Sequence, residues 1–173
     1  VGMLRTALLL AALGFAWVTA GIADPKWCRK RAPKDSSGNR EFTFCQAYDT
    51  VPFLMRNKKL ANAFISYYWS EVAGKGRKYV TLTRAGTLEK KVKNYMRTTM
   101  RGKVRLEPVD YRKIFRAVDR TRNNLIDRSE VFKTMSARKP FPFLVMAGFQ
   151  FLDKNNNGFL SLREVEEPLC EVA

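Results

Sequence analysis

The chain has 173 residues, 46% of them apolar, which is enough to bury the core of one globular domain. Thirty-two lysines and arginines face sixteen aspartates and glutamates, giving a net charge of +16. A surface of this sign favours anionic partners, and it argues against a freely diffusing calcium buffer, because such proteins are usually acidic. The absence of histidine excludes Ser-His-Asp and Cys-His catalysis and histidine-ligated zinc or haem.

The first predicted element is the apolar segment 6–23, TALLLAALGFAWVTAGIA, which has eighteen residues and no charge. Eighteen is close to the lower limit for a helix that spans the hydrocarbon core of a bilayer. We expect a single transmembrane helix within 1–25, with Trp17 and Trp27 as interfacial anchors. The alternative is a secretory signal peptide that is cleaved after Ala20 or Ala23, since small residues precede both positions.

The basic residues that follow this segment predict which side of the membrane holds the rest of the chain. Positive charge favours the cytosolic, matrix or stromal side.

Three cysteines, Cys28, Cys45 and Cys170, are too few for a zinc or iron–sulfur site within one chain. A Cys28–Cys45 disulfide is consistent with an oxidising compartment, and three free thiols are at least equally consistent with the spacing.

The middle region, 26–107, reads as a basic linker followed by amphipathic helices. Apolar residues at helical spacing predict a helix within 51–72, and a second set predicts another around 88–101. The second helix is basic on its remaining surface, at Lys90, Lys91, Lys93, Arg97 and Arg101. A face of this kind binds anionic lipid or a partner groove, and an ordinary solvated helix surface is the competing interpretation.

Residues 153–164, DKNNNGFLSLRE, have the spacing of a calcium-binding loop. Such a loop takes oxygen ligands from positions 1, 3, 5, 7, 9 and 12 and needs glycine at position 6 for a sharp turn. Gly158 occupies the sixth position and Leu160 the eighth. The predicted ligands of this Asp153 loop are Asp153, Asn155, Asn157, the Phe159 carbonyl, Ser161 and Glu164.

Residues 119–130, DRTRNNLIDRSE, repeat the pattern, and their first residue lies 34 positions before Asp153. The predicted ligands of this Asp119 loop are Asp119, Thr121, Asn123, the Leu125 carbonyl, Asp127 and Glu130. Asn124 replaces the sixth-position glycine, and asparagine is one of the few other residues that tolerate a left-handed backbone. We expect Ile126 to face Leu160 in a short strand pair between the loops.

Apolar residues flank both loops at helical spacing. Two twelve-residue patterns with such flanks resemble the EF-hand family across about 108–173. The resemblance implies a mainly α fold that ends in a pair of helix–loop–helix units. It also implies Ca²⁺ as the ligand, bound more readily by the Asp153 loop. The competing interpretation is a degenerate EF-hand pair, kept as a packing module with one or both sites empty. Few carboxylates within a basic chain predict an affinity of about 10⁻⁶–10⁻⁴ M.

No residue pattern suggests an enzyme. We expect a non-catalytic accessory subunit of a respiratory or photosynthetic complex, single-pass in an organellar inner or thylakoid membrane, with its C-terminal bulk on the matrix or stromal side. Its expected partners are the other subunits and anionic lipid, and no specific nucleic acid. The alternatives are a membrane-tethered calcium sensor, in which Phe115, Met135, Phe149 and Phe151 bind a target helix, and a secreted or lumenal EF-hand protein.

Overall fold

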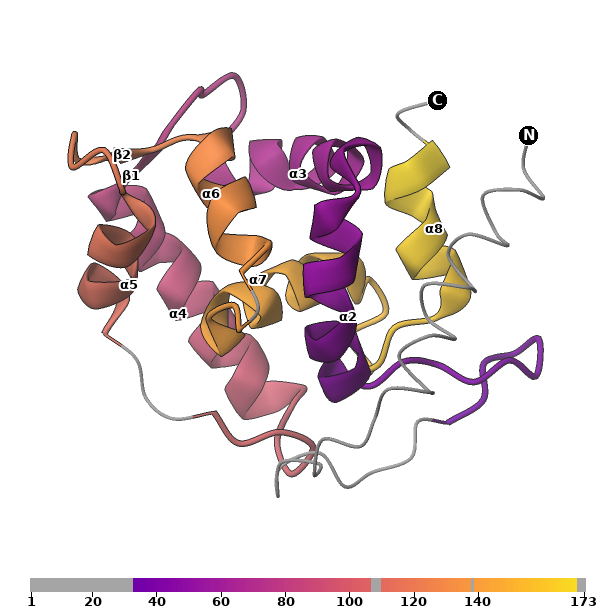
Figure 1. The fold of residues 1–173 in the computed structure, drawn as a ribbon. Coiled ribbons are helices and arrows are strands. Elements are labelled where there is room, and N and C mark those ends of the chain that lie inside the picture. The colour runs from indigo at the N-terminus through magenta and orange to yellow at the C-terminus, as the bar shows by residue number, and fades with distance from the viewer. Residues whose placement is uncertain (1–32, 107–109, 138, 171–173) are drawn as a thin grey trace.

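The computed structural model describes residues 33–106, 110–137 and 139–170, and these form a mainly helical fold (Figure 1). Its elements in chain order are α2 (Phe44–Arg56), α3 (Lys58–Ala73), β1 (Val80–Thr81), α4 (Leu82–Thr98), α5 (Tyr111–Val118), β2 (Leu125–Ile126), α6 (Arg128–Met135), α7 (Pro142–Leu152) and α8 (Leu162–Cys170). The predicted segment 6–23 and Cys28 lie outside the described residues. Within the described part, no helix combines the length and the apolarity that a membrane span requires.

The helix predicted within 51–72 is two helices, because the chain breaks at Asn57. Asn57 ends α2 in an extended conformation, with φ −83° and ψ 104°. Its side-chain oxygen then accepts hydrogen bonds from the N–H groups of Lys59 and Leu60, which begins α3. Periodicity alone missed this boundary, since one asparagine serves as the last cap of α2 and the first cap of α3.

The predicted basic amphipathic helix is α4. Val92 and Tyr95 on its apolar face are buried, and Lys90, Lys91, Lys93 and Arg97 are exposed. Thr81 caps its first turn by accepting a hydrogen bond from the N–H of Arg84. Residues 103–106, which follow α4, form neither helix nor strand.

Helices from both halves of the chain share one apolar core. α2 packs against α7, and α3 packs against α8, so the first two described helices lie beside the last two (Figure 1). Phe44 on α2 meets Phe149 on α7 edge to face, with ring centroids 5.7 Å apart. α4 packs against α5 and α7 in the other part of the fold.

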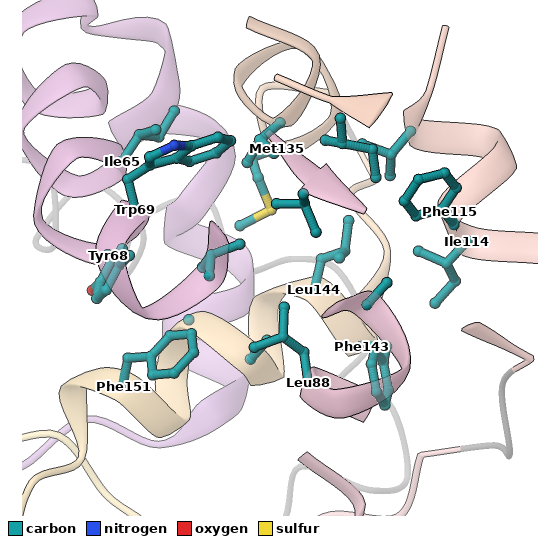
Figure 2. A pocket seen from close by; sticks show the side chains of 18 of the residues that line it. Ile65, Tyr68, Trp69, Leu88, Ile114, Phe115, Met135, Phe143, Leu144 and Phe151 are labelled. Atoms are coloured by element: carbon teal, nitrogen blue, oxygen red, sulfur yellow. The ribbon is translucent and has the colours of Figure 1, made fainter. Parts of the chain in front are cut away.

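An apolar cavity of about 160 Å³ lies within this core, between α3, α4, α5, α6 and α7 (Figure 2). Trp69 comes from α3, Phe115 from α5, Met135 from α6 and Leu144 from α7. Almost all of the cavity lining is carbon. The cavity is therefore suited to apolar groups and does not resemble a polar active site.

Candidate functional site

The Asp119 loop joins α5 to α6 and folds inward on its two terminal carboxylates. Asp119 is 5% exposed and Glu130 is 3% exposed. The Asp119 carboxylate accepts hydrogen bonds from the N–H groups of Asn123 (3.2 Å) and Asn124 (2.8 Å). The Thr121 hydroxyl lies 3.3 Å from Asp119 Oδ1 and 3.0 Å from Glu130 Oε1, so the first and twelfth positions of the loop meet around it.

The Asp153 loop joins α7 to α8 and has the same internal bonds. The Asp153 carboxylate, 1% exposed, accepts from the N–H groups of Asn157 (3.0 Å) and Gly158 (2.8 Å). Glu164 is also buried, and it accepts from the N–H groups of Lys154 (2.9 Å) and Ser161 (2.8 Å). The terminal carboxylates of this loop are therefore held inward as in the Asp119 loop.

The middle oxygens of the loops also correspond. Asn123 Oδ1 accepts from the N–H of Leu125 at 2.9 Å, and Asn157 Oδ1 accepts from the N–H of Phe159 at 2.8 Å. Asn155 Oδ1 accepts from the N–H of Asn157 at 3.0 Å. These contacts turn the amide oxygens toward the loop backbone, leaving each oxygen a second lone pair.

The sharp turn expected at the sixth position is present in both loops. Asn124 has φ 63° and Gly158 has φ 79°. The fourth positions, Arg122 and Asn156, are left-handed as well, with φ 58° and 55°. Asparagine thus gives the Asp119 loop the same turn that glycine gives the Asp153 loop.

Each loop ends in a helix cap that uses its ninth and twelfth positions. The Asp127 side chain accepts from the N–H of Glu130 at 2.9 Å, and the Glu130 carboxylate accepts from the N–H of Asp127 at 3.1 Å. Ser161 and Glu164 make the equivalent reciprocal pair at 3.3 and 2.8 Å. The caps fix the position of both glutamates at the start of α6 and α8.

Within the described part of the chain, the buried carboxylates of the two loops have no lysine or arginine within ion-pair distance. The ion pairs within 4 Å there are Lys93–Glu89 and Lys154–Glu167. Burial alone would raise the pKa of Glu130, but hydrogen bonds from Thr121 and Asp127 outweigh burial and lower the pKa below its usual 4.5. Glu130 is therefore an anion at neutral pH.

Between the terminal carboxylates, the other donors of the Asp153 loop are amides, a hydroxyl and a carbonyl, and the Asp119 loop adds the Asp127 carboxylate to donors of these kinds. In the part of the chain that the structure describes, no three acidic or cysteine side chains gather into a ready-made metal centre. A cation at the Asp153 loop would thus be held by one carboxylate at each end and by neutral oxygens between them, and a cation at the Asp119 loop would also meet the Asp127 carboxylate. An all-oxygen set of this kind suits Ca²⁺.

The predicted strand pair between Ile126 and Leu160 is wrong. Ile126 pairs with Val80, because β2 runs antiparallel to β1. Leu160 forms an antiparallel bridge with Phe42, with N–O distances of 2.7 and 2.9 Å. The two loops that resemble each other in sequence are therefore each paired with a segment from the first half of the chain.

Segment 35–46, which pairs with the Asp153 loop, has the same twelve-residue register, and the sequence reasoning missed it. Phe42 is its eighth residue, and Thr43 and Gln46 form a capping box at its ninth and twelfth positions. Gly38, its fourth residue, has φ 79°. Oxygen-bearing side chains at alternate positions were the available signal, at Asp35, Ser37, Asn39, Thr43 and Gln46.

Segment 73–84, which pairs with the Asp119 loop, has the same twelve-residue spacing but contains no aspartate or glutamate. Its eighth residue is Val80, and its ninth, Thr81, caps α4. The twelfth position is Arg84, whose guanidinium donates to the carbonyls of Val72 (3.0 Å) and Glu71 at the end of α3. The twelfth position of this segment therefore carries the positively charged Arg84, whereas the twelfth position of each of the two loops carries a glutamate.

Two buried side chains from upstream elements reach the Asp153 loop. The Tyr95 hydroxyl on α4 donates to Asp153 Oδ2. Burial first, and then the hydrogen bond to Asp153, raise the pKa of Tyr95, so the hydroxyl keeps its proton. Glu41, only 6% exposed, accepts from Asn157 Nδ2 at 3.1 and 3.2 Å.

Of the cysteines, Cys45 is buried in α2, and its predicted disulfide partner Cys28 lies outside the described residues. Cys170 is exposed and free at the end of α8.

Comparison of the chain with protein-family models, with curated proteins and with solved structures finds no match.

Proposed function

We propose that the chain is a non-catalytic calcium-binding protein of the EF-hand class, with one Ca²⁺ at the Asp119 loop and one at the Asp153 loop. The first and twelfth carboxylates of each loop are buried, and no lysine or arginine among the residues that the structure describes pairs with them, which supports the proposal most directly. An ionised carboxylate in the protein interior is costly unless a cation or several hydrogen bonds compensate it. A divalent cation between the two carboxylates would remove their mutual repulsion.

Each residue of the two loops has a role in this proposal. The carboxylates at both ends and the Asp127 carboxylate supply the charge, and the Leu125 and Phe159 carbonyls supply the seventh-position oxygen. Neutral side-chain oxygens complete the set at Thr121, Asn123, Asn155, Asn157 and Ser161. Arginines and a lysine interleave with these ligands and weaken binding, so we expect dissociation constants of about 10⁻⁶–10⁻⁴ M.

Isothermal titration of the full chain with Ca²⁺ tests the proposal. Glu130→Gln and Glu164→Gln should each remove one binding event, and Glu89→Gln, a carboxylate paired with Lys93 on α4, should remove none. Because the two loops do not pair with each other, removing Ca²⁺ binding at one loop should change the Ca²⁺ affinity of the other by no more than about twofold. Absence of binding at millimolar Ca²⁺ would refute the proposal.

The apolar cavity favours a second candidate function, a calcium sensor. Phe115, Met135 and Phe151, three of the four residues expected to meet a target helix, line the cavity, whereas Phe149 packs against Phe44. Opening of this space on calcium binding would present it to an amphipathic helix. Limited proteolysis with and without Ca²⁺ tests this, and an unchanged digestion pattern at millimolar Ca²⁺ would rule it out.

The accessory-subunit hypothesis stays a prediction, because segment 6–23 lies outside the described residues. The exposed lysines and arginine of α4 support docking on an anionic surface, either lipid or an acidic subunit. Blue-native electrophoresis after mild detergent extraction tests the hypothesis. A band of several hundred kilodaltons would favour it, and migration as a monomer would contradict it.

A further inference from the structure

Glu41 is a buried carboxylate that no loop pattern assigns. It is the seventh residue of segment 35–46 and lies directly before Phe42, which bridges to Leu160. It is 6% exposed, and no lysine or arginine lies within ion-pair distance of it in the described part of the chain. Its side chain extends from segment 35–46 to the Asp153 loop, which lies far away in sequence, and contacts Asn157 there.

The side-chain contact of Glu41 is with Asn157, the fifth-position residue of the Asp153 loop. Asn157 Nδ2 donates to Glu41 Oε1 at 3.1 Å and to Oε2 at 3.2 Å. An amide group can face a cation with its oxygen or, after a 180° flip, with its nitrogen, and only the oxygen binds a metal. A carboxylate accepts hydrogen bonds only, so it selects the orientation in which the nitrogen faces Glu41 and the oxygen faces the loop.

The other contact of Asn157 agrees with this orientation. Asn157 Oδ1 accepts from the N–H of Phe159 at 2.8 Å. The amide is thus held at both ends, by Glu41 at its nitrogen and by the loop backbone at its oxygen. The Phe42–Leu160 bridge keeps the two segments in the register that makes the contact.

We propose that Glu41 is a positioning residue for the calcium site of the Asp153 loop, acting through the side-chain amide of Asn157. The inference rests on the proposed function. It makes segment 35–46 a supporting partner of the Asp153 loop, with Glu41 outside the set of direct ligands. Outer-shell partners of this kind typically change metal affinity by about 10- to 100-fold when they are removed.

The test uses the full chain with Glu130→Gln as background, so that only the Asp153 loop binds. Glu41→Gln should weaken Ca²⁺ affinity by about tenfold, because a glutamine offers a donor as well as an acceptor and no longer selects the amide orientation. Glu89→Gln makes the same charge change at a carboxylate that pairs with Lys93, and it should alter affinity by less than twofold. Equal effects of the two variants would overturn the inference.

A charge exchange gives a readout that loss of packing would not produce. Asn157→Asp adds a carboxylate to the loop, which by itself should raise calcium affinity. Opposite Glu41, the new carboxylate would instead meet a buried like charge, so we expect affinity to fall by about tenfold. Combining Asn157→Asp with Glu41→Gln should restore affinity to at least that of Glu41→Gln alone, since the glutamine amide can donate to the aspartate. A double variant weaker than both single variants would overturn the inference.

A calcium-free measurement separates failure of the inference from failure of the proposed function. In NMR spectra without Ca²⁺, the side-chain amide resonances of Asn157 should shift in Glu41→Gln and remain in place in Glu89→Gln. A shift together with no calcium binding by the wild type would refute the proposed site and keep the Glu41–Asn157 contact. Calcium binding without that shift would refute the contact and keep the site.

Discussion

The hydroxyl of Tyr95 on α4 donates a hydrogen bond to the carboxylate of Asp153, 58 positions later in the chain. Asp153 opens the loop proposed to bind calcium and is 1% exposed, and Tyr95 is 3% exposed. The bond joins the loop to a helix that contributes none of the proposed ligands. The stability of the loop therefore depends on packing between α4 and the end of α7.

Tyr95→Phe should destabilise the calcium-free protein by about 2 kcal/mol, because a hydrogen bond to a buried charged group is lost and the carboxylate keeps only its backbone donors. Urea unfolding in calcium-free buffer measures this change. Tyr79→Phe, at a tyrosine that is 46% exposed, is the matched control and should have little effect. Equal midpoints for wild type and Tyr95→Phe would contradict the expectation.

The left-handed sixth position of the Asp119 loop predicts an order of stabilities. Asn124 has φ 63°, a conformation that costs alanine about 1–2 kcal/mol and glycine almost nothing. We expect Asn124→Gly to stabilise the calcium-free protein by about 0.5 kcal/mol and Asn124→Ala to destabilise it by about 1 kcal/mol. Thermal unfolding gives the order, and an Ala variant as stable as the Gly variant would show that the turn is not left-handed.

The reverse change at the corresponding position of the Asp153 loop should be harmful. A Cβ on Gly158 would lie 2.9 Å from Lys103 Cδ, so a side chain there has to displace the lysine stem. The end of the lysine side chain is flexible, so the main cost of moving it is the loss of its hydrogen bond to the Thr99 carbonyl. Gly158→Asn should therefore destabilise the protein by no more than about 1 kcal/mol, because asparagine tolerates the backbone conformation. The same change should cost less in a Lys103→Ala background, where that hydrogen bond is already absent. An equal cost in both backgrounds, measured by thermal unfolding, would place the cost in the backbone instead.

Arg84 closes segment 73–84 with bonds to the carbonyls of Val72 and Glu71. Arg84→Gln should destabilise the protein by about 1–3 kcal/mol, because charge-assisted bonds at the end of α3 are lost. Arg101→Gln, at an exposed arginine, is the control.

Arg84→Glu should not create a third calcium site, because Ala73, Lys75 and Arg77 occupy the first, third and fifth positions. A gain of a calcium-binding event in Arg84→Glu would contradict this.

Acid should destabilise the calcium-free protein through Glu130. Its pKa is lower in the folded chain than the usual 4.5. A carboxyl group of this kind stabilises the fold above its unfolded pKa, and the contribution is lost as pH falls through the lower, folded value. The free energy of unfolding should therefore decrease below about pH 4.5, and less steeply in Glu130→Gln. Parallel pH profiles of the two proteins, measured by urea unfolding from pH 6 to pH 3, would contradict this.

The sequence by itself determined the local geometry of the two loops. Three features shape each loop within twelve residues. Oxygen-bearing side chains stand at alternate positions, the sixth residue tolerates a left-handed backbone, and a glutamate at the twelfth position caps the next helix. Apolar residues at helical spacing also predicted the flanking helices, and the structure buries these residues, namely Ile114, Phe115, Val118, Val145 and Phe149. Interactions of this range are set by neighbours in the chain.

Only the tertiary structure decided which segments pair. The eighth-position residues Ile126 and Leu160 are both apolar, so the loop pattern does not choose their partners, Val80 and Phe42. The contacts of Tyr95 with Asp153 and of Glu41 with Asn157 span 58 and 116 positions. A sequence pattern does not encode such contacts, because they depend on how all the helices pack around one shared core.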